Sequence, residues 1–206
     1  ASADVCGSTL RKWRRLGCDL ALVDLSRAYL QIQVSPELWK FQRVRYEGQV
    51  YYMTRLGFGL SVAPKIMTCI LNYVLAQNEQ VRRGTNSYID DIMIDCSVTK
   101  VDVVIDVLNR YGLATKAPEL IKKNGPMVRV LGLSVKQNNK NQLTWERANP
   151  ITKISVGDKT TKRQLFSICG RLVGHLPVCG WLRTSCSFLK RLVNEIEWDE
   201  NIPTHV

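Results

Sequence analysis

The sequence lacks any apolar run close to the roughly 18 consecutive residues that a membrane-spanning helix requires. No basic segment followed by an apolar stretch opens it, so no secretory signal is recognisable. Internal repeats and low-complexity stretches are also missing. The chain is 45% hydrophobic and 23% charged, which is ordinary for a globular protein. We therefore expect a soluble, intracellular protein that is not secreted and has no membrane partner.

Paired cysteine spacing is missing as well. The chain has seven cysteines but no C-x-x-C motif. Their number is odd and several lie in apolar patterns, which is typical of buried free thiols in a reducing compartment. Cys169, His175 and Cys179 are a zinc candidate, although they lack the paired ligand spacing typical of zinc sites.

Negative charge is scarce relative to positive charge: 18 acidic residues stand against 29 basic ones, and the net charge is +11. The basic excess flanks residues 51–99, where 4 basic residues balance 4 acidic ones. This pattern suits a polyanion held along both sides of an acidic site. A basic surface that only aids solubility is the alternative.

The pattern of apolar residues predicts the order strand, hairpin, helix, strand, strand, helix, strand through residue 135. The predicted elements are a buried strand at 20–24, a hairpin at 41–54 turning at Glu47-Gly48, a helix from Pro64 with its apolar face at Ile66, Ile70, Tyr73, Val74 and Leu75, strands on both sides of Asp90-Asp91, a helix at 101–111 and a strand at 128–135. Without the hairpin, this is the split β-α-β order of a ferredoxin-like sheet, an α+β fold.

The last quarter of the chain is predicted to be helical. Residues 150–158 read as a linker, and Thr160 or Thr161 can cap a helix that runs to His175. A second helix follows Gly180, with a basic outer surface.

Residues 88–94 place two adjacent carboxylates, Asp90 and Asp91, in an apolar hairpin without glycine. Like charges repel at this range, and a bland turn would use Asn-Gly or Asp-Gly. A divalent cation would remove the repulsion, because Mg²⁺ prefers carboxylate oxygens. Asp24 ends a strand expected beside this turn, so three carboxylates could hold two metal ions about 4 Å apart. A purely structural acidic turn is the alternative.

Five segments then occur in a recognisable order. Residues 22–34 (LVDLSRAYLQIQV) resemble the first catalytic motif of the reverse transcriptases of retroviruses and long-terminal-repeat retrotransposons. Residues 56–64 (LGFGLSVAP) resemble the second, and the Tyr-Ile-Asp-Asp tetrad at 88–91 matches the third. Residues 110–116 (RYGLATK) resemble the fourth, and residues 130–133 (VLGL) resemble the primer-grip turn.

The resemblance implies a metal-dependent active site. Asp24 and Asp90 would be the main ligands of two Mg²⁺ ions, which Mn²⁺ could replace, with Asp91 and the carbonyl of Leu25 completing the set. Lys116 would protonate or neutralise the leaving pyrophosphate.

It also implies a site for a deoxynucleoside triphosphate. Backbone amides near Arg27 and Ala28 would face the triphosphate. Tyr29 would lie under the sugar and exclude a 2′-hydroxyl. Phe58 and Gly59 would line the pocket. Gly57 stands where the family usually has proline, which predicts a less fixed loop.

An RNA/DNA primer-template is the implied partner. Leu131 and Gly132 would place the primer terminus, and Tyr88 lies at the same site. Basic side chains on the C-terminal helices would contact phosphates, namely Arg171, His175, Arg183, Lys190 and Arg191. A packing role for these helices is the alternative.

The implied architecture is a polymerase palm with helices on one face of its sheet, followed by a small helical thumb. We expect a remnant of the fingers at 1–19, the palm at 20–149 with an inserted hairpin at 41–54, and the thumb at 150–206. The implied activity is template-directed DNA synthesis from RNA or DNA, within a retroelement polyprotein of the cytoplasm, nucleus or retroelement particle. Most of the fingers and a ribonuclease H domain are expected outside this chain, so the chain alone should polymerise weakly. The alternatives are an inactive or domesticated nucleic-acid-binding module and another two-metal palm enzyme.

Overall fold

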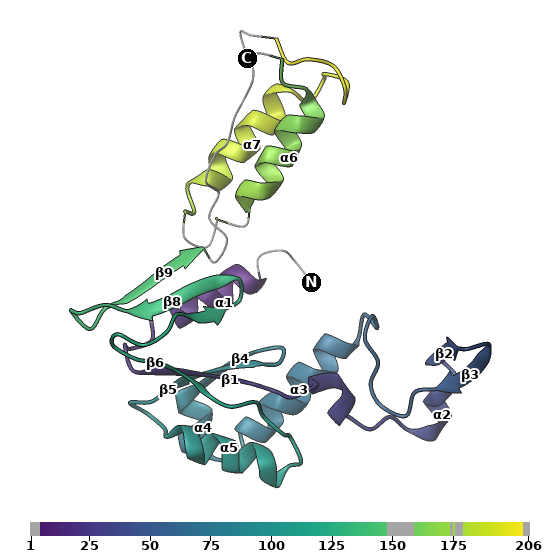
Figure 1. Ribbon diagram of the computed structural model, residues 1–206, viewed down its shortest axis with the longest axis vertical. Helices are drawn as coiled ribbons and strands as arrows, with labels where there is room; N and C mark the ends of the chain where they lie inside the picture. The colour runs from purple at the N-terminus through teal and green to yellow at the C-terminus, as the bar shows by residue number, and fades with distance from the viewer. Residues whose placement is uncertain (1–4, 148–158, 174, 176–178, 204–206) are drawn as a thin grey trace. The chain divides into compact units, whose positions relative to one another are not determined.

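A computed structural model describes residues 5–147, 159–173, 175 and 179–203. The expected linker at 150–158 lies outside the described residues. The chain divides into two compact units. One consists of Arg15–Val128 and Gln137–Gln142, and the other of Ala1–Arg14, Arg129–Lys136 and Leu143–Val206. Each unit is described by itself below (Figure 1).

The first unit is built on a four-stranded antiparallel sheet with the order β4-β5-β1-β6. Its strands are β1 (Leu20–Asp24), β4 (Thr85–Tyr88), β5 (Asp91–Asp95) and β6 (Glu119–Ile121). This is the strand order of a ferredoxin-like sheet, so the predicted α+β fold class is confirmed. The fourth strand was predicted wrongly, because β6 takes the place expected for residues 128–135.

Residues 128–137 instead form a tight hairpin of β7 (Val128–Val130) and β8 (Leu133–Gln137). Leu131 and Gly132 have φ angles of 47° and 80°, and two such residues in succession reverse a chain. The segment expected to form a single strand is therefore two strands joined by a turn. With β9 (Leu143–Arg147) these strands make a three-stranded sheet in the order β7-β8-β9. The same unit contains the helix α1 (Val5–Trp13).

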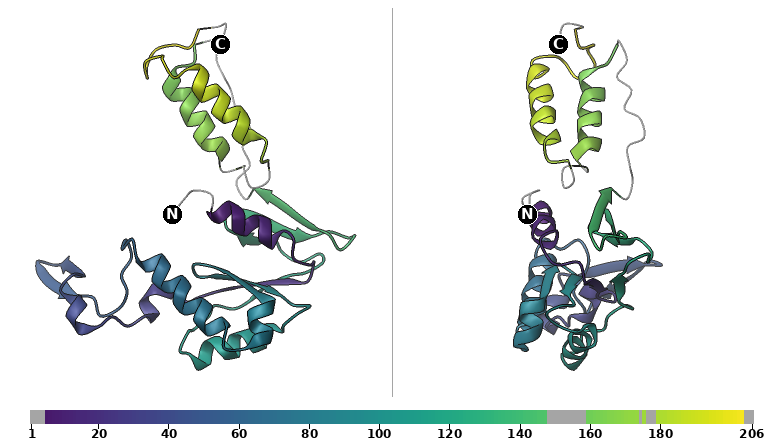
Figure 2. Two further views of the ribbon diagram at one scale, coloured as in Figure 1. Left: turned by 180° about the vertical axis from the view of Figure 1, so that it is seen from behind. Right: turned by 90° about the vertical axis from the view of Figure 1, so that its left-hand side faces the viewer.

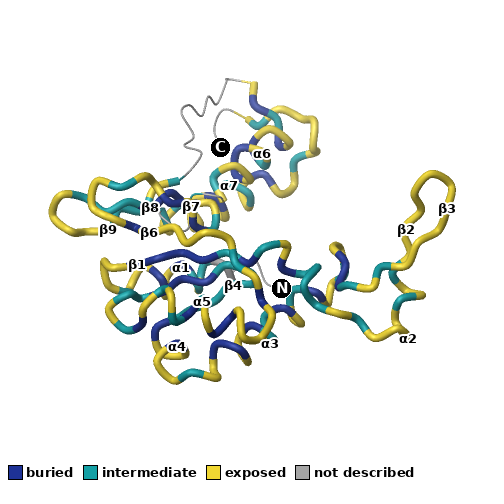
Figure 3. Tube along the Cα trace, turned by 60° about the horizontal axis from the view of Figure 1, so that its bottom comes forward, coloured by how far each residue is buried: buried dark blue, intermediate teal, exposed yellow. Residues whose placement is uncertain are grey.

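Two helices, α3 (Ala63–Leu75) and α5 (Val101–Arg110), cover one face of the four-stranded sheet (Figures 1 and 2). The core between them is fully buried and aliphatic. It contains Ala21 and Val23 of β1, Ile92 and Ile94 of β5, Met67 and Leu71 of α3, and Val104 and Leu108 of α5. Figure 3 shows this burial along β1. Gly112, with φ 74°, follows the end of α5 as predicted.

The buried stripe of α3 consists of Ala63, Met67, Leu71, Val74 and Leu75. The sequence pattern placed Ile66 and Tyr73 on that face, but they are 36% and 63% exposed. Val74 and Leu75 are buried as predicted and Ile70 packs against the core, so the prediction was wrong at Ile66 and Tyr73. Apolar side chains lie on both sides of the helix, so spacing alone did not select between them. A separate helix, α4 (Glu79–Gly84), follows, and the Asn78 side chain caps it by accepting a 3.0 Å hydrogen bond from the Val81 N–H.

The predicted hairpin consists of β2 (Arg43–Tyr46) and β3 (Gln49–Tyr52), preceded by the short helix α2 (Pro36–Trp39). Glu47 and Gly48 both have positive φ, 48° and 78°, which suits a two-residue turn. Every residue of the two strands is exposed. The hairpin projects away from the four-stranded sheet (Figure 1).

The C-terminal helices are α6 (Lys162–Val173) and α7 (Leu182–Leu192). The expected cap is at Thr161, whose N–H donates to the Gln164 side chain while its hydroxyl accepts from the Gln164 N–H. Buried Lys162 donates to the carbonyls of Asn194 and Ile196 beyond the end of α7. The small core between α6 and α7 consists of Leu165, Cys169, Cys186 and Val193.

Six of the seven cysteines, Cys18, Cys69, Cys96, Cys169, Cys179 and Cys186, are free thiols. Cys169 and Cys186 are buried as expected, whereas Cys18 and Cys69 are exposed. No helix among the described residues is both long and apolar enough to cross a bilayer.

We predict that Leu71→Ala lowers the free energy of unfolding by about 3 kcal/mol, because it leaves a cavity in the core. Tyr73→Ala, two residues away on the exposed side, should cost about 1 kcal/mol, the loss of its edge contact with Tyr111. Urea unfolding of both variants measures the difference. A larger loss for Tyr73→Ala would contradict the assigned core face.

Candidate active site

Three carboxylates meet at one end of the four-stranded sheet. Strand pairing sets Asp24 of β1 directly opposite Asp91 of β5. Asp90 occupies the turn between β4 and β5, and its carbonyl accepts a 3.2 Å hydrogen bond from the N–H of Leu25. The apolar residues that bury β1 and β5 therefore also bring these distant acidic residues together. Tyr88 lies in the same turn, paired with Asp91.

The acidic turn has an unfavourable backbone conformation. Ile89 has a φ of 56°, in the left-handed region that β-branched residues rarely adopt. Such a residue costs about 1–2 kcal/mol relative to glycine. Strain of this kind persists where surrounding structure enforces it, and it is concentrated at functional sites.

Lys116 joins the carboxylates from the segment after α5. Its side-chain Nζ donates a hydrogen bond to Oδ2 of Asp24. Its backbone N–H donates to the Asp24 carbonyl at 2.8 Å, and the Ser26 N–H donates to the Ala114 carbonyl at 3.0 Å. The hydrogen bond to Asp24 and the negative charge of that carboxylate raise the pKa of Lys116.

Crowding of negative charge affects the other two carboxylates. Burial, with repulsion from Asp90 and Asp24, raises the pKa of Asp91 to about 6. Burial also raises the pKa of Asp90, and the Asp24 charge adds to this. Both carboxylates therefore ionise at a cost that a bound cation would offset.

The donor set fits a hard divalent cation. Oδ1 of Asp24 is buried and accepts no hydrogen bond from the described residues, which marks a polar atom in need of a partner. The arrangement itself is incomplete, since no three His, Cys, Asp or Glu side chains in the described ranges are grouped to hold a metal ion. This applies to the three carboxylates and also to the zinc candidate at Cys169, His175 and Cys179. Lys116 holds Oδ2 of Asp24, so a cation bound by the carboxylates would compete with the Lys116 ammonium for the Asp24 charge.

Among the residues assigned to a nucleotide, Tyr29 lies within electrostatic reach of Asp90. Arg27, with φ 48°, leads into a short 3₁₀ helix, η1 (Ala28–Gln31), in which Ala28 is buried. The Tyr29 ring contacts the Phe58 ring edge-on, with centroids 5.4 Å apart. Burial raises the pKa of Tyr29, and the charge of Asp90 adds to this. Gly59 has a φ of 82°, which glycine adopts without strain.

Gly57, which departs from the family pattern, makes a hydrogen bond that proline could not make. Its N–H donates to Oε1 of Gln42 at 2.8 Å. A Cβ on Gly57 would also approach that oxygen to 2.9 Å. This hydrogen bond ties the loop to Gln42. The sequence pattern did not single out Gln42.

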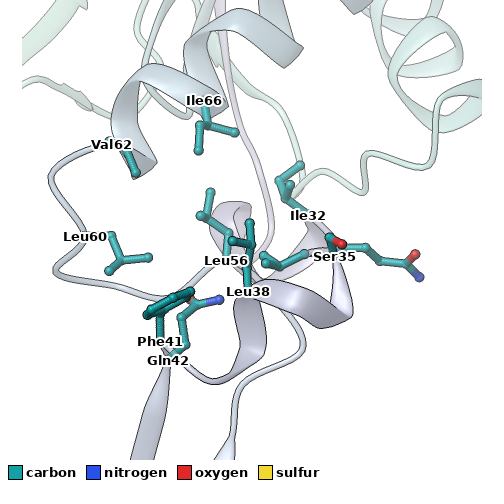
Figure 4. Close-up of a pocket in the computed structure, with 11 residues that line it drawn as sticks. Ile32, Ser35, Leu38, Phe41, Gln42, Leu56, Leu60, Val62 and Ile66 are labelled. Atoms are coloured by element: carbon teal, nitrogen blue, oxygen red, sulfur yellow. The ribbon is translucent and has the colours of Figure 1, made fainter.

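A separate pocket of about 320 Å³ lies beyond η1 (Figure 4). Its wall is mostly aliphatic and includes Ile32, Leu38, Leu56, Leu60, Val62 and Ile66. None of the three carboxylates lines it, and neither does Lys116. This pocket is therefore suited to apolar groups and not to the proposed chemistry.

The remaining predicted site residues belong to the other compact unit. Leu131 and Gly132 form the β7–β8 turn. Arg171 lies exposed on α6 and Arg191 on α7. The Nζ of Lys190 lies 5.1 Å from the centre of the Phe166 ring, and the backbone N–H of His175 donates to the Leu172 carbonyl. Arg183 lies in the same helix as Lys190 and is exposed.

Comparison with solved structures identifies the fold. The chain is similar to the foamy viral protease-reverse transcriptase dRH in complex with double-stranded DNA, at 18% identity and a TM-score of 0.70, over 95% of this chain and 34% of that one. It is also similar to the foamy viral protease-reverse transcriptase with double-stranded DNA, at 17% identity and a TM-score of 0.63, over 92% and 39%. The complex of that enzyme with an RNA/DNA hybrid gives 18% identity and a TM-score of 0.65, over 95% and 26%.

The chain thus has a reverse-transcriptase-like fold and spans 26% to 39% of the length of these structures. A family model described as a domain of unknown function, DUF7047, matches residues 161–206. No curated protein matches the sequence.

We predict that Asp91→Asn stabilises the protein at pH 7 by about 1–2 kcal/mol in the absence of divalent cations. The folded-state pKa of about 6 exceeds the ordinary value of 3.8. The folded state therefore binds more protons between these values, and stability falls as pH rises through this window. Thermal unfolding between pH 4 and 7 should show this slope in the parent and in the exposed control Asp106→Asn. The slope should be clearly smaller in Asp91→Asn, where the raised pKa of Asp90 alone remains. An unchanged slope in Asp91→Asn would contradict the assignment.

Proposed function

We propose that this chain is the catalytic part of an RNA-directed DNA polymerase, which transfers deoxynucleotides to a primer on an RNA or DNA template. The observation that carries the proposal is the meeting of Asp24, Asp90 and Asp91 at adjacent strand ends, with Lys116 on Asp24. The reverse-transcriptase-like fold supports it.

In this proposal, the carboxylates of Asp24, Asp90 and Asp91 would hold two Mg²⁺ ions, or Mn²⁺ in their place, with the carbonyl of Leu25 as a further ligand. Bound cations supply charge that activates the primer 3′-hydroxyl and neutralises the leaving pyrophosphate. Lys116 is released from Asp24 to face that pyrophosphate and donate a proton to it.

Tyr29 and Phe58 form one wall of the deoxynucleotide site, with backbone amides of Arg27 and Ala28 toward the phosphates and Gly59 beside the base and sugar. The edge contact between the two rings fixes the Tyr29 ring next to Asp90. A ring in this position excludes the 2′-hydroxyl of a ribonucleotide by collision.

The helices α6 and α7, which the domain of unknown function covers, bind the primer-template in this proposal. Their exposed cations contact phosphates without reading sequence. Leu131, Gly132 and Tyr88 contact the primer end. The neighbouring structures hold double-stranded DNA or an RNA/DNA hybrid, which supports this class of ligand. Fingers and a ribonuclease H domain would be supplied by further parts of a retroelement polyprotein.

We predict that Asp90→Asn lowers single-nucleotide incorporation on an RNA template with Mg²⁺ on the order of 1,000-fold, because it removes a charge that stabilises the transition state. The assay is run with the chain alone and with the chain joined to a fingers segment, since the chain alone should be weak. Asp106→Asn, on the exposed side of α5, is the matched control.

No incorporation by the parent in either form, together with tight and salt-sensitive primer-template binding, would contradict the enzyme proposal. It would favour the alternative, a nucleic-acid-binding module that has lost catalysis.

We also predict that Tyr29→Ala lowers the preference for deoxynucleotides over ribonucleotides by about tenfold or more, because the ring no longer meets the 2′-hydroxyl. Competition between dNTP and rNTP in primer extension measures this ratio. Tyr51→Ala, on the exposed hairpin, should leave it unchanged. An unchanged ratio of dNTP to rNTP incorporation in Tyr29→Ala would show that Tyr29 does not contact the sugar.

A further inference from the structure

Gln31, the last residue of η1, makes an unusual set of side-chain contacts. Its Oε1 accepts a 2.6 Å hydrogen bond from the N–H of Ala114, and its Nε2 donates to the Ala114 carbonyl at 3.0 Å. The same Nε2 also donates to the Ser26 carbonyl at 2.5 Å. The side-chain amide therefore pairs with both backbone groups of a residue 83 positions away.

Only one orientation of this amide satisfies the contacts. Its surroundings are one N–H and two carbonyls, which require one acceptor and two donors. A flipped amide would set an NH₂ group against the Ala114 N–H and an oxygen against two carbonyls. The three bonds consequently define the orientation of the side chain.

These bonds extend a short backbone ladder. Leu25 and Thr115 form an isolated antiparallel bridge, flanked by the hydrogen bonds from Ser26 N–H to the Ala114 carbonyl and from Lys116 N–H to the Asp24 carbonyl. Beyond Ser26 the chain turns away at Arg27, which has φ 48°. Regular antiparallel pairing would join the Ala114 N–H directly to the Ser26 carbonyl. The Gln31 amide lies between these two groups instead, accepting from the first and donating to the second.

The ladder connects two parts of the candidate active site. One strand of it carries Asp24, and the other carries Lys116, whose side chain reaches Asp24. Gln31 itself ends the 3₁₀ helix that contains Tyr29. A substitution at Gln31 is therefore expected to shift both Lys116 and Tyr29. Gln31 makes no described hydrogen bond to any of the three carboxylates.

We propose that Gln31 is a positioning residue of the candidate active site: its amide holds the Ala114–Lys116 segment in register with Asp24–Ser26, and so places Lys116. Its effect on catalysis rests on the proposed function, but its effect on the segment does not.

The first test is amide hydrogen exchange of the 206-residue chain with Gln31→Met, which keeps the side-chain length and removes all three bonds. Exchange at Ala114, Lys116 and Ser26 should become at least about tenfold faster, while Ile92 and Ile94 in the core stay unchanged. Gln33→Met is the matched control, because no described side-chain hydrogen bond involves Gln33. Should Gln31→Met fold poorly, Gln31→Glu keeps an acceptor for the Ala114 N–H but no donor, and should give a smaller increase. Unchanged exchange at Ala114, or an equal rise throughout the chain, would overturn the proposal.

The second test is a double-mutant cycle in single-nucleotide incorporation. Gln31→Met should lower kcat about tenfold or more with little change in the KM for primer-template, and it should have no further effect in a Lys116→Ala background. Additive losses, or a rise in KM alone, would show that Gln31 does not act through Lys116. If the parent incorporates nothing, the proposed function fails, and hydrogen exchange still decides the role of Gln31.

Discussion

The electrostatic repulsion among Asp24, Asp90 and Asp91 is the constraint on which the rest of the site depends. Antiparallel pairing of β1 with β5 places Asp24 opposite Asp91, and the burial that stabilises these strands also removes water from the carboxylates. Burial and like charge together raise the pKa values of Asp90 and Asp91. An asparagine at either position would lower this repulsion, because each of these carboxylates acts on its neighbours.

The neighbouring features act on this charge or hold it in place. Lys116 compensates part of it through Asp24, and the Gln31 amide fixes the segment that carries Lys116. The strained Ile89 keeps the turn tight, so that Asp90 and Asp91 stay at the end of the sheet. Lys116 occupies one oxygen of Asp24, so its ammonium and a metal ion would compete for this carboxylate.

Parts of this arrangement were predictable from the sequence because local patterns specify them. The run at Leu20–Asp24 reads as a buried strand and is one, and Glu47-Gly48 turns a hairpin as its residues indicate. The core face of α3 was predicted correctly at Val74 and Leu75 but wrongly at Tyr73, since only packing in the folded core distinguishes Leu71 from Tyr73 as a core residue. The resemblance to the primer-grip turn placed a turn at Leu131-Gly132, but the apolar pattern predicted a single strand at 128–135. Apolar residues on both sides of Gly132 look like one strand when the sheet they join is unknown.

Long-range hydrogen bonds were the least accessible to sequence reasoning. Gln31 and Gln42 have no local signal beyond being polar residues near apolar ones, and their partners, Ala114 and Gly57, lie 83 and 15 residues away. The acidic residues were found because adjacent carboxylates in an apolar hairpin are chemically costly and because the family motifs occur in order. Residues whose burial costs free energy are recognisable in a sequence. Residues whose hydrogen bonds are simply satisfied by distant partners are not.

The central claim is that the three carboxylates form a divalent-cation site. Anomalous diffraction from crystals grown with Mn²⁺ and a deoxynucleoside triphosphate tests it most directly. We predict an anomalous peak coordinated by Asp24 and Asp90, with the Lys116 side chain no longer on Asp24. Crystals that bind the nucleotide but show no Mn²⁺ at these carboxylates, with Lys116 still on Asp24, would contradict the account.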